Sequence, residues 1–272
     1  MKIYISADIE GVAGVMTPQQ GQPGNTEYER ARRLMTEEVN AVIEGALDAG
    51  ATEILVNDAH GPMTNLLPEL LHPVAEVIQG KPKPLNMFCG LDASYAAVFC
   101  TGYHTRASEQ GVLAHTTNGF AFRSVRLNGQ PLGEAGIYGA YAGSLGVPVA
   151  FVSGDNLCVA ELRDHFPQAE FVQVKQALGN RAARSLPLPA ARNALREGAA
   201  RAVRRAVTIP PFRIDGPYVL ELEMGGPALA DLAATLPPAE RRDGVTVALP
   251  ADSVADAIRW MNSVSAMSAF LR

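Results

Sequence analysis

Acidic side chains directly follow the first apolar segment of this sequence. Residues 2–7 read as a short strand, and Asp8, Glu10 and Gly11 come next. Residues two apart in a strand project to the same side, so the two carboxylates are expected to face the same way. Such a pair suits a cation, although a turn cap at Asp8 beside a solvated Glu10 would give the same pattern. The rest of the chain decides between the two.

Histidines recur at equivalent positions. His60 follows a strand predicted over residues 53–57, His104 follows one predicted over 96–101, and Glu134 begins a predicted helix. Parallel strands bring their carboxyl ends to one edge of a sheet, where α/β proteins bind ligands. Two imidazoles with three carboxylates suit Zn²⁺, and other divalent metals also fit this set. The excess of carboxylates over one tetrahedral site indicates two ions that share one bridging ligand. The predicted metal ligands are Asp8, Glu10, His60, His104 and Glu134, with Asp8 as the bridge.

The other histidines are interpreted differently. His115 lies in a loop close to the predicted ligands, so we expect a catalytic residue that moves protons and does not bind metal. His72 and His165 lie beside turns that contain proline, and we expect them to be structural or exposed. The predicted site therefore uses three of the five histidines.

Composition limits the classes of protein that this chain can represent. Its 272 residues are 47% hydrophobic and 19% charged, which is typical of a soluble protein with one large or two modest domains. A net charge of -5 disfavours a nucleic-acid or anionic-membrane partner. No apolar run of membrane-spanning length and no signal segment is evident, and the three cysteines form no paired motif. We expect a cytoplasmic protein with reduced thiols.

Strand and helix patterns alternate along the first part of the chain, which favours an α/β fold with a mainly parallel, doubly wound sheet. Beyond about residue 170 the pattern becomes a smaller α+β part, so we predict a metal-site domain at 1–166 and a smaller domain at 167–272. An arginine-rich stretch at 181–205 is interpreted as a solvated helix face or a subunit contact. The other expected elements are helices at 26–49, 66–71, 134–145 and 253–270, a hairpin at Asn128-Gly129, and strands at 121–127, 148–153, 171–174, 218–224 and 244–249.

The spaced motifs resemble those of the DppA-type D-aminopeptidases, which are zinc-dependent peptidases, over nearly the whole length. The matching residues are Ser6-Ala7-Asp8-Ile9-Glu10-Gly11, Tyr28-Glu29-Arg30, Met35-Thr36-Glu37-Glu38, Val56-Asn57-Asp58-Ala59-His60, Gly102-Tyr103-His104, Arg106-Ala107-Ser108, His115 and Gly133-Glu134. The resemblance implies that the five predicted ligands hold a pair of zinc ions and that His115 is catalytic. It also implies a closed homo-oligomer, plausibly a decameric ring, whose inner space admits only short peptides.

The expected reaction is hydrolysis of a peptide or amino-acid amide bond next to a free N-terminal amine, and the resemblance implies that the N-terminal residue is a D-amino acid. A dinuclear metal site would activate a water and polarise the scissile carbonyl, and His115 would stabilise the oxyanion or protonate the leaving amine. Residues 16–24, a loop, are expected to influence side-chain preference.

Two other classes of protein fit part of the pattern. Asp8-Ile9-Glu10-Gly11-Val12 superficially resembles the first motif of haloacid-dehalogenase-type phosphatases, but the second acid is a glutamate and the histidines stay unexplained. A non-catalytic metal-binding module with a closed ion site is the other alternative. Metal content combined with assays on amino-acid amides and phosphate esters would separate the three.

Overall fold

A seven-stranded sheet forms the larger part of the computed structural model, which describes all residues from 1 to 272. Its strand order is β3-β2-β1-β4-β7-β8-β9, and every neighbouring pair is parallel except the last. The central strands are buried almost throughout, as expected for a parallel sheet covered on both faces. The strands are β1 (Lys2–Ala7), β2 (Glu53–Asp58), β3 (Ala75–Ile78), β4 (Ala97–Tyr103), β7 (Val149–Asp155), β8 (Glu170–Gly179) and β9 (Ala182–Ser185).

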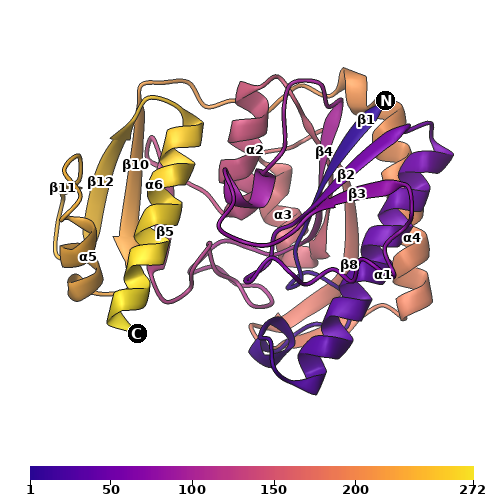
Figure 1. Ribbon diagram of the computed structural model, residues 1–272, viewed down its shortest axis with the longest axis horizontal. Coiled ribbons are helices and arrows are strands. Elements are labelled where there is room, and N and C mark those ends of the chain that lie inside the picture. Colours follow the sequence, from indigo (N-terminus) through magenta and orange to yellow (C-terminus); the bar gives the residue numbers. More distant parts are fainter.

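Helices cover both faces of this sheet (Figure 1). On one face α1 (Thr26–Asp48) and α4 (Leu188–Arg205) pack against each other, and on the other lie α2 (Glu134–Ser144) and α3 (Asn156–Arg163). Arg192 and Arg196 of α4 form ion pairs with acidic side chains of α1. Part of the arginine-rich stretch therefore lies along a seam between two helices.

A second, antiparallel sheet has the order β11-β12-β10-β5-β6 and lies beyond α2 (Figure 1). Helix α6 (Val254–Met267) packs against this sheet and against α2, so one core of 41 buried residues extends from the first sheet to the second. The remaining elements are β5 (Phe122–Leu127), β6 (Gln130–Pro131), β10 (Tyr218–Met224), α5 (Pro227–Ala233), β11 (Glu240–Arg241), β12 (Thr246–Ala251) and the 3₁₀ helices η1 (Pro18–Gly21), η2 (Asn86–Phe88), η3 (Ala206–Thr208) and η4 (Ser268–Leu271).

The fold class and the Asn128-Gly129 hairpin agree with the prediction, whereas the prediction of a helix at 66–71 is wrong. Those residues form turns, because the Asp58 carboxylate accepts the backbone N–H groups of Asn65 and Leu66 and Pro68 follows at once. Helix α3 was not anticipated; the side chain of Asp155 caps it by accepting two backbone N–H groups.

The expected division at residue 166 does not follow the division between the sheets. Strands β8 and β9 and helix α4 lie after that residue but belong to the larger sheet and its cover. Strands β5 and β6 lie before it but pair in the smaller sheet. The cause is that the chain crosses from the first sheet to the second and back between β4 and α2.

No helix combines the length and the apolar character that a membrane span requires.

Candidate metal centre

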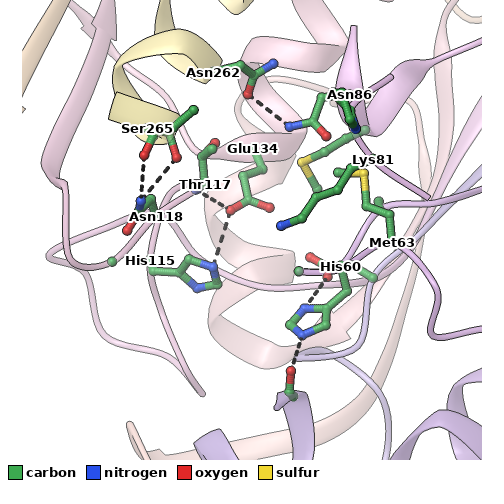
Figure 2. Close-up of a pocket in the computed structure, with 18 of the residues that line it drawn as sticks. His60, Met63, Lys81, Asn86, His115, Thr117, Asn118, Glu134, Asn262 and Ser265 are labelled. Atoms are coloured by element: carbon green, nitrogen blue, oxygen red, sulfur yellow. Dashed lines mark hydrogen bonds and ion pairs between the residues drawn. The ribbon is translucent and has the colours of Figure 1, made fainter. Parts of the chain in front are cut away.

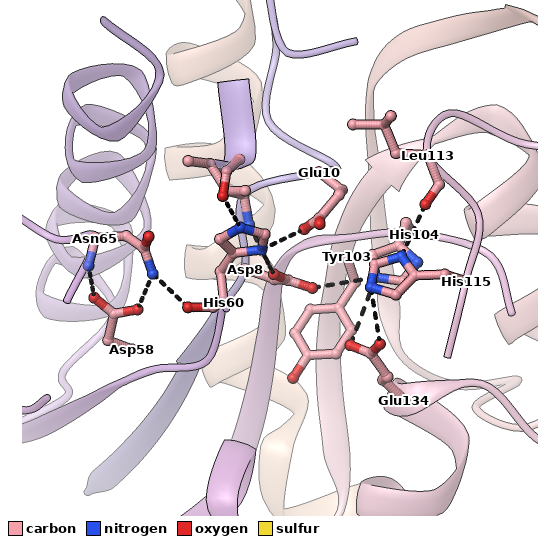
Figure 3. Close-up of polar contacts among 12 residues, drawn as sticks. Asp8, Glu10, Asp58, His60, Asn65, Tyr103, His104, Leu113, His115 and Glu134 are labelled. Atoms are coloured by element: carbon pink, nitrogen blue, oxygen red, sulfur yellow. Dashed lines mark hydrogen bonds and ion pairs between the residues drawn. The ribbon is translucent and has the colours of Figure 1, made fainter. Parts of the chain in front are cut away.

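The site residues gather where the order of the large sheet reverses. Strands β2 and β3 lie to one side of β1, whereas β4 and β7 lie to the other. Asp8 and Glu10 follow β1, His60 follows β2 and His104 follows β4 (Figure 3). A crevice at the carboxyl ends of such a pair of strands is the usual ligand site of this architecture.

Glycines bring the two central loops into backbone contact. The N–H of Gly11 donates to the carbonyl of Gly102 at 2.7 Å, and the N–H of Asp8 donates to that of Thr101 at 2.8 Å. Gly102 has φ +74°, and a Cβ there would lie 2.3 Å from the Asp8 carbonyl oxygen. Only glycine adopts this φ and also lets the two backbones come so close. Gly102 therefore fixes the distance between the Asp8 and His104 loops.

Asp8 lies between two groups of donor atoms. Its Oδ1 is 3.3 Å from His60 Nδ1, and its Oδ2 is 3.4 Å from His104 Nε2. His60 Nδ1 also lies 2.9 Å from Glu10 Oε2, whereas His104 Nε2 lies 3.5 Å from Glu134 Oε2. The five predicted ligands thus form two sets of three that share Asp8, one with Glu10 and His60 and one with His104 and Glu134.

Backbone carbonyls orient the rings of the two predicted histidine ligands. His60 Nε2 donates to Gly21 O at 2.8 Å, and His104 Nδ1 donates to Thr105 O at 2.9 Å. Because a carbonyl only accepts, the proton of each neutral ring is held there and the other nitrogen faces the carboxylates with a free lone pair. In histidines that bind metal, the ring nitrogen that faces away from the ion typically donates a hydrogen bond of this kind.

Several buried donor atoms in the centre have no hydrogen-bond partner. They are Asp8 Oδ2, Glu10 Oε2 and His104 Nε2. These atoms lie close to oppositely charged groups, but the contacts lack the alignment of hydrogen bonds. Each atom is directed toward the space between the side chains and not at one hydrogen-bond partner. Buried polar atoms without partners are rare, and a bound cation would satisfy all three. The donor set fits divalent metal ions that accept nitrogen and oxygen ligands.

Electrostatics among the side chains of the centre support the same conclusion. Burial opposes positive charge on His60 and His104, yet the carboxylates around them, chiefly Glu10 and Glu134 respectively, raise the pKa of each imidazole well above its usual value. Burial likewise opposes ionisation of Asp8, but the rings of His104 and His60 hold its pKa well below the usual range. The three carboxylates therefore create a strong local demand for positive charge.

His115 lies beside the second set of donors. Its ring stacks on that of His104 with centroids 4.2 Å apart, and its Nδ1 donates to Leu113 O at 2.9 Å. Its Nε2 is 3.6 Å from Glu134 Oε1, and the side chain is 26% exposed. Of the histidines in the centre, His115 has the greatest side-chain exposure.

A buried lysine that sequence reasoning missed supports the first loop from below. The ammonium of Lys175, in β8, donates to the backbone carbonyls of Glu10, Val12 and Val15. On the α1 side, Glu38 accepts the N–H of Ala13 at 2.9 Å. Lys175 follows an apolar strand segment as an ordinary surface lysine would, so the sequence carries no signal for this role.

A cavity of about 830 Å³ opens above the metal centre (Figure 2). Asp8, His60, His115 and Glu134 contribute to its lining. The opposite wall comes from α6 and η4 and includes Ser265. The volume is typical of small-molecule sites, so a short ligand has room next to the donor atoms.

Comparison with known proteins identifies the family of this chain. A family model described as D-aminopeptidase, peptidase family M55, matches residues 1–263. The chain belongs to the D-aminopeptidase family. A D-aminopeptidase of Bacillus subtilis (strain 168) is 37% identical over 246 residues, which cover 90% of this chain and 89% of that protein.

A solved structure of the same family has nearly the same fold. It is described as a Zn-dependent D-aminopeptidase, DppA, from Bacillus subtilis and as a self-compartmentalizing protease. It superposes with a TM-score of 0.96 at 34% identity, covering 99% of this chain and 98% of the other. The fold and the family inferred from the spaced motifs are thus confirmed.

The two remaining histidines of this D-aminopeptidase family member lie away from the centre. The ring of His165 packs against Phe166 and Phe212, and His72 Nδ1 accepts the N–H of Val74 in a turn. Neither belongs to a group of residues that could hold a metal ion.

Proposed function

We propose that this chain is a zinc-dependent aminopeptidase that hydrolyses short peptides or amino-acid amides bearing a free N-terminal D-amino acid. The observation that carries the proposal is the position of Asp8, which lies between two histidine-carboxylate groups beneath an open cavity. The family membership and the description of the solved relative as Zn-dependent support the choice of metal.

We assign the five predicted ligands to two zinc ions. Asp8, Glu10 and His60 would hold one, and Asp8, His104 and Glu134 the other, so that Asp8 bridges both. A pair of bound zinc ions supplies an activated water nucleophile and a Lewis acid that polarises the scissile carbonyl. Lys175 and the Gly11–Gly102 contact keep the Asp8 loop in place, so the ligands stay close to their binding positions.

His115 acts as a proton donor in this proposal. Its Nδ1 is fixed by the Leu113 carbonyl, which leaves Nε2 directed at Glu134 and close to the cavity (Figures 2 and 3). Because Nδ1 already carries a proton, Nε2 donates one only as the imidazolium, and that second proton would have access both to the developing oxyanion and to the leaving amine. The backbone N–H of Thr117 donates to the same Glu134 oxygen and holds that carboxylate in place.

The alternative functions are less well supported. A phosphatase of the haloacid-dehalogenase type would need Asp8 as a free nucleophile, whereas Asp8 is buried between two imidazoles. A closed, non-catalytic metal site would not need the adjoining cavity or the partly exposed His115.

Assembly and location form part of the proposal. The solved relative is described as self-compartmentalizing, which supports a homo-oligomer whose sites face an inner space. For its form we propose the decameric ring that the sequence resemblance implies. Exposed apolar side chains such as Leu178 and Val207 are available for subunit contacts. All three cysteines are free thiols, which fits action in the cytoplasm.

The decisive test measures metal and chirality together. We expect about two zinc ions per chain by elemental analysis, and hydrolysis of D-alanine p-nitroanilide well above that of the L-enantiomer. A chelator should abolish the activity, and zinc should restore it. Zinc-loaded protein that hydrolyses neither enantiomer, nor any D-aminoacyl dipeptide, would overturn the proposal.

A further inference from the structure

The wall of the cavity carries a charge opposite to that of the whole chain. The chain has a net charge of -5, yet the only acidic residues in the cavity lining are Asp8 and Glu134, which belong to the metal centre. All other charged side chains of the lining are cationic: Lys81, Lys83 and Arg272. A substrate group that reaches the wall therefore meets positive charge only.

Two of these cations already have partners. The ammonium of Lys83 donates to the carbonyl oxygen of Asp58 at 2.6 Å and is partly buried. The guanidinium of Arg272 donates to the side-chain oxygen of Asn118 at 3.0 Å and lies over the ring of Phe120. Both side chains are committed to the protein, so neither has its full set of donors free for a ligand.

Lys81 is different. It forms no ion pair and no side-chain hydrogen bond within the chain, and its side chain points into the cavity between His60 and Glu134 (Figure 2). The neighbouring amides are paired among themselves, since Asn86 donates to Asn262 at 3.0 Å. An ammonium on a flexible stem, directed at the space above a metal centre, is available to bind an anionic group of the substrate.

We propose that Lys81 binds the C-terminal carboxylate of the substrate and thereby selects dipeptides and other very short peptides with a free carboxyl end. This inference rests on the proposed aminopeptidase function and specifies its substrate class. With the N-terminal residue at the metal centre, a dipeptide extends by at most about 7 Å, so its carboxylate stays inside a cavity of about 830 Å³. Each further residue moves the carboxylate about 3.5 Å farther from the metal centre, so we expect a longer peptide to lose the contact with Lys81.

The test compares D-Ala-Gly with its amide, D-Ala-Gly-NH₂, on the zinc-loaded protein. We expect kcat/KM to favour the free acid about tenfold, the lower end for a hydrogen bond between charged groups near solvent. In Lys81→Met this ratio should fall to about one, with the loss mainly in KM because the contact exists in the ground state as well. Lys81→Arg keeps the charge and should keep most of the preference.

Lys83→Met is the matched control, because it removes a second ammonium from the same segment that is bound to a backbone carbonyl. It should retain the wild-type ratio of the two substrates. Equal kcat/KM for acid and amide in the wild type, or an unchanged ratio in Lys81→Met, would overturn the role of Lys81. Hydrolysis of neither peptide by the wild type would contradict the aminopeptidase function itself, so the two failures are distinguishable.

The location of the carboxylate is tested separately with D-Ala-Asp-NH₂, whose negative charge lies on the side chain. We expect this amide to be hydrolysed no better than D-Ala-Gly-NH₂. If it matches D-Ala-Gly, the cavity recognises a side-chain carboxylate, and the assignment to the C-terminus is wrong.

Discussion

Asp8 differs from the other acids of the centre because its two oxygens face different histidines. Oδ1 lies near His60 and Oδ2 near His104, at 3.3 and 3.4 Å. Glu10 forms its ion-pair contact with His60, at 2.9 Å, and its carboxylate also lies within 4.8 Å of ligand atoms of His104 and His115. Of the five predicted ligands, only Asp8 is shared by the two sets proposed to hold zinc, so it would contribute to both ions and Glu10 to one.

This asymmetry leads to a prediction about metal content. Asp8→Ala should lose both zinc ions, because each set of three donors is reduced to two. Glu10→Ala should lose about one ion per chain, since the set of Asp8, His104 and Glu134 stays complete. Elemental analysis after gel filtration at one fixed free zinc concentration measures the difference. Equal losses in the two variants would contradict Asp8 as the bridge.

His115 gives a second prediction at the same scale. His115→Ala should keep both zinc ions and the fold while kcat falls about 10²–10⁴-fold, the usual contribution of a general acid or base. The loss should be in kcat because the contact forms in the transition state. Metal content and single-substrate kinetics provide the measurement.

His104→Ala is the comparison for this variant, because the two rings stack at 4.2 Å but His104 belongs to a donor set with Asp8. It should lose metal first and activity as a consequence. His115 also lies within metal-binding reach of Glu10 and His104. If His115→Ala loses zinc as readily as His104→Ala, His115 is a ligand and its assignment as a proton donor is wrong.

The elements that carry the site were largely predictable, for a simple reason. Buried parallel strands are short apolar runs in the sequence. His60 and His104 could therefore be recognised as polar residues that directly follow such runs. Contacts made by the backbone carry no such pattern. The carbonyls of Gly21 and Thr105 orient the rings through loop geometry, and Lys175 reaches the Asp8 loop from a strand far along the chain. Those features depend on tertiary packing and were not visible in the sequence.

The contact between the β1 and β4 loops gives a prediction about glycine. Gly102→Ala combines an unfavourable φ with an overlap against the Asp8 carbonyl, so we expect a loss of more than about 3 kcal/mol in the free energy of unfolding. Zinc affinity should fall as well, because the Asp8 and His104 loops move apart.

Gly50→Ala is the matched control. Gly50 follows α1 with φ +96°, but a Cβ there would meet nothing within 4 Å. Its cost should be about 1–2 kcal/mol with zinc binding unchanged. Urea unfolding and zinc titration of both variants separate the cost of the positive φ from the cost of the steric overlap with the Asp8 carbonyl. Similar stability losses in the two would mean that close packing of the loops is unimportant.

At the scale of the whole molecule, the sequence pattern predicted two consecutive parts. The fold does contain two sheets, but neither sheet is formed by one continuous segment of the chain. Strand β5 pairs with β10, and β8 pairs with β7 across the expected boundary at residue 166. A change of sequence pattern along the chain cannot reveal which strands belong to which sheet, because strand pairing depends on which strands meet in space. One continuous core connects both sheets.

Assembly gives the last prediction. If the chain forms a closed ring, light scattering after gel filtration should give one species of about ten chain masses that does not change on dilution. It should cleave short peptides and leave an intact folded protein uncut, because the sites face an inner space. A monomer, or rapid cleavage of the folded protein, would contradict this model.

The exchange of strands between the sheets also sets the order in which activity becomes available during synthesis on the ribosome. All the predicted site residues are present once Glu134 has been made, yet β5 pairs only with the two-residue strand β6 until residues 218–224 emerge. The cavity wall formed by α6 and η4 comes later still. A nascent chain therefore carries every predicted metal ligand while it still exposes the unpaired edge of β5, which favours aggregation. The cavity is complete only when residues 254–271 have joined the fold, so a partly made chain lacks the wall that would hold the proposed substrate.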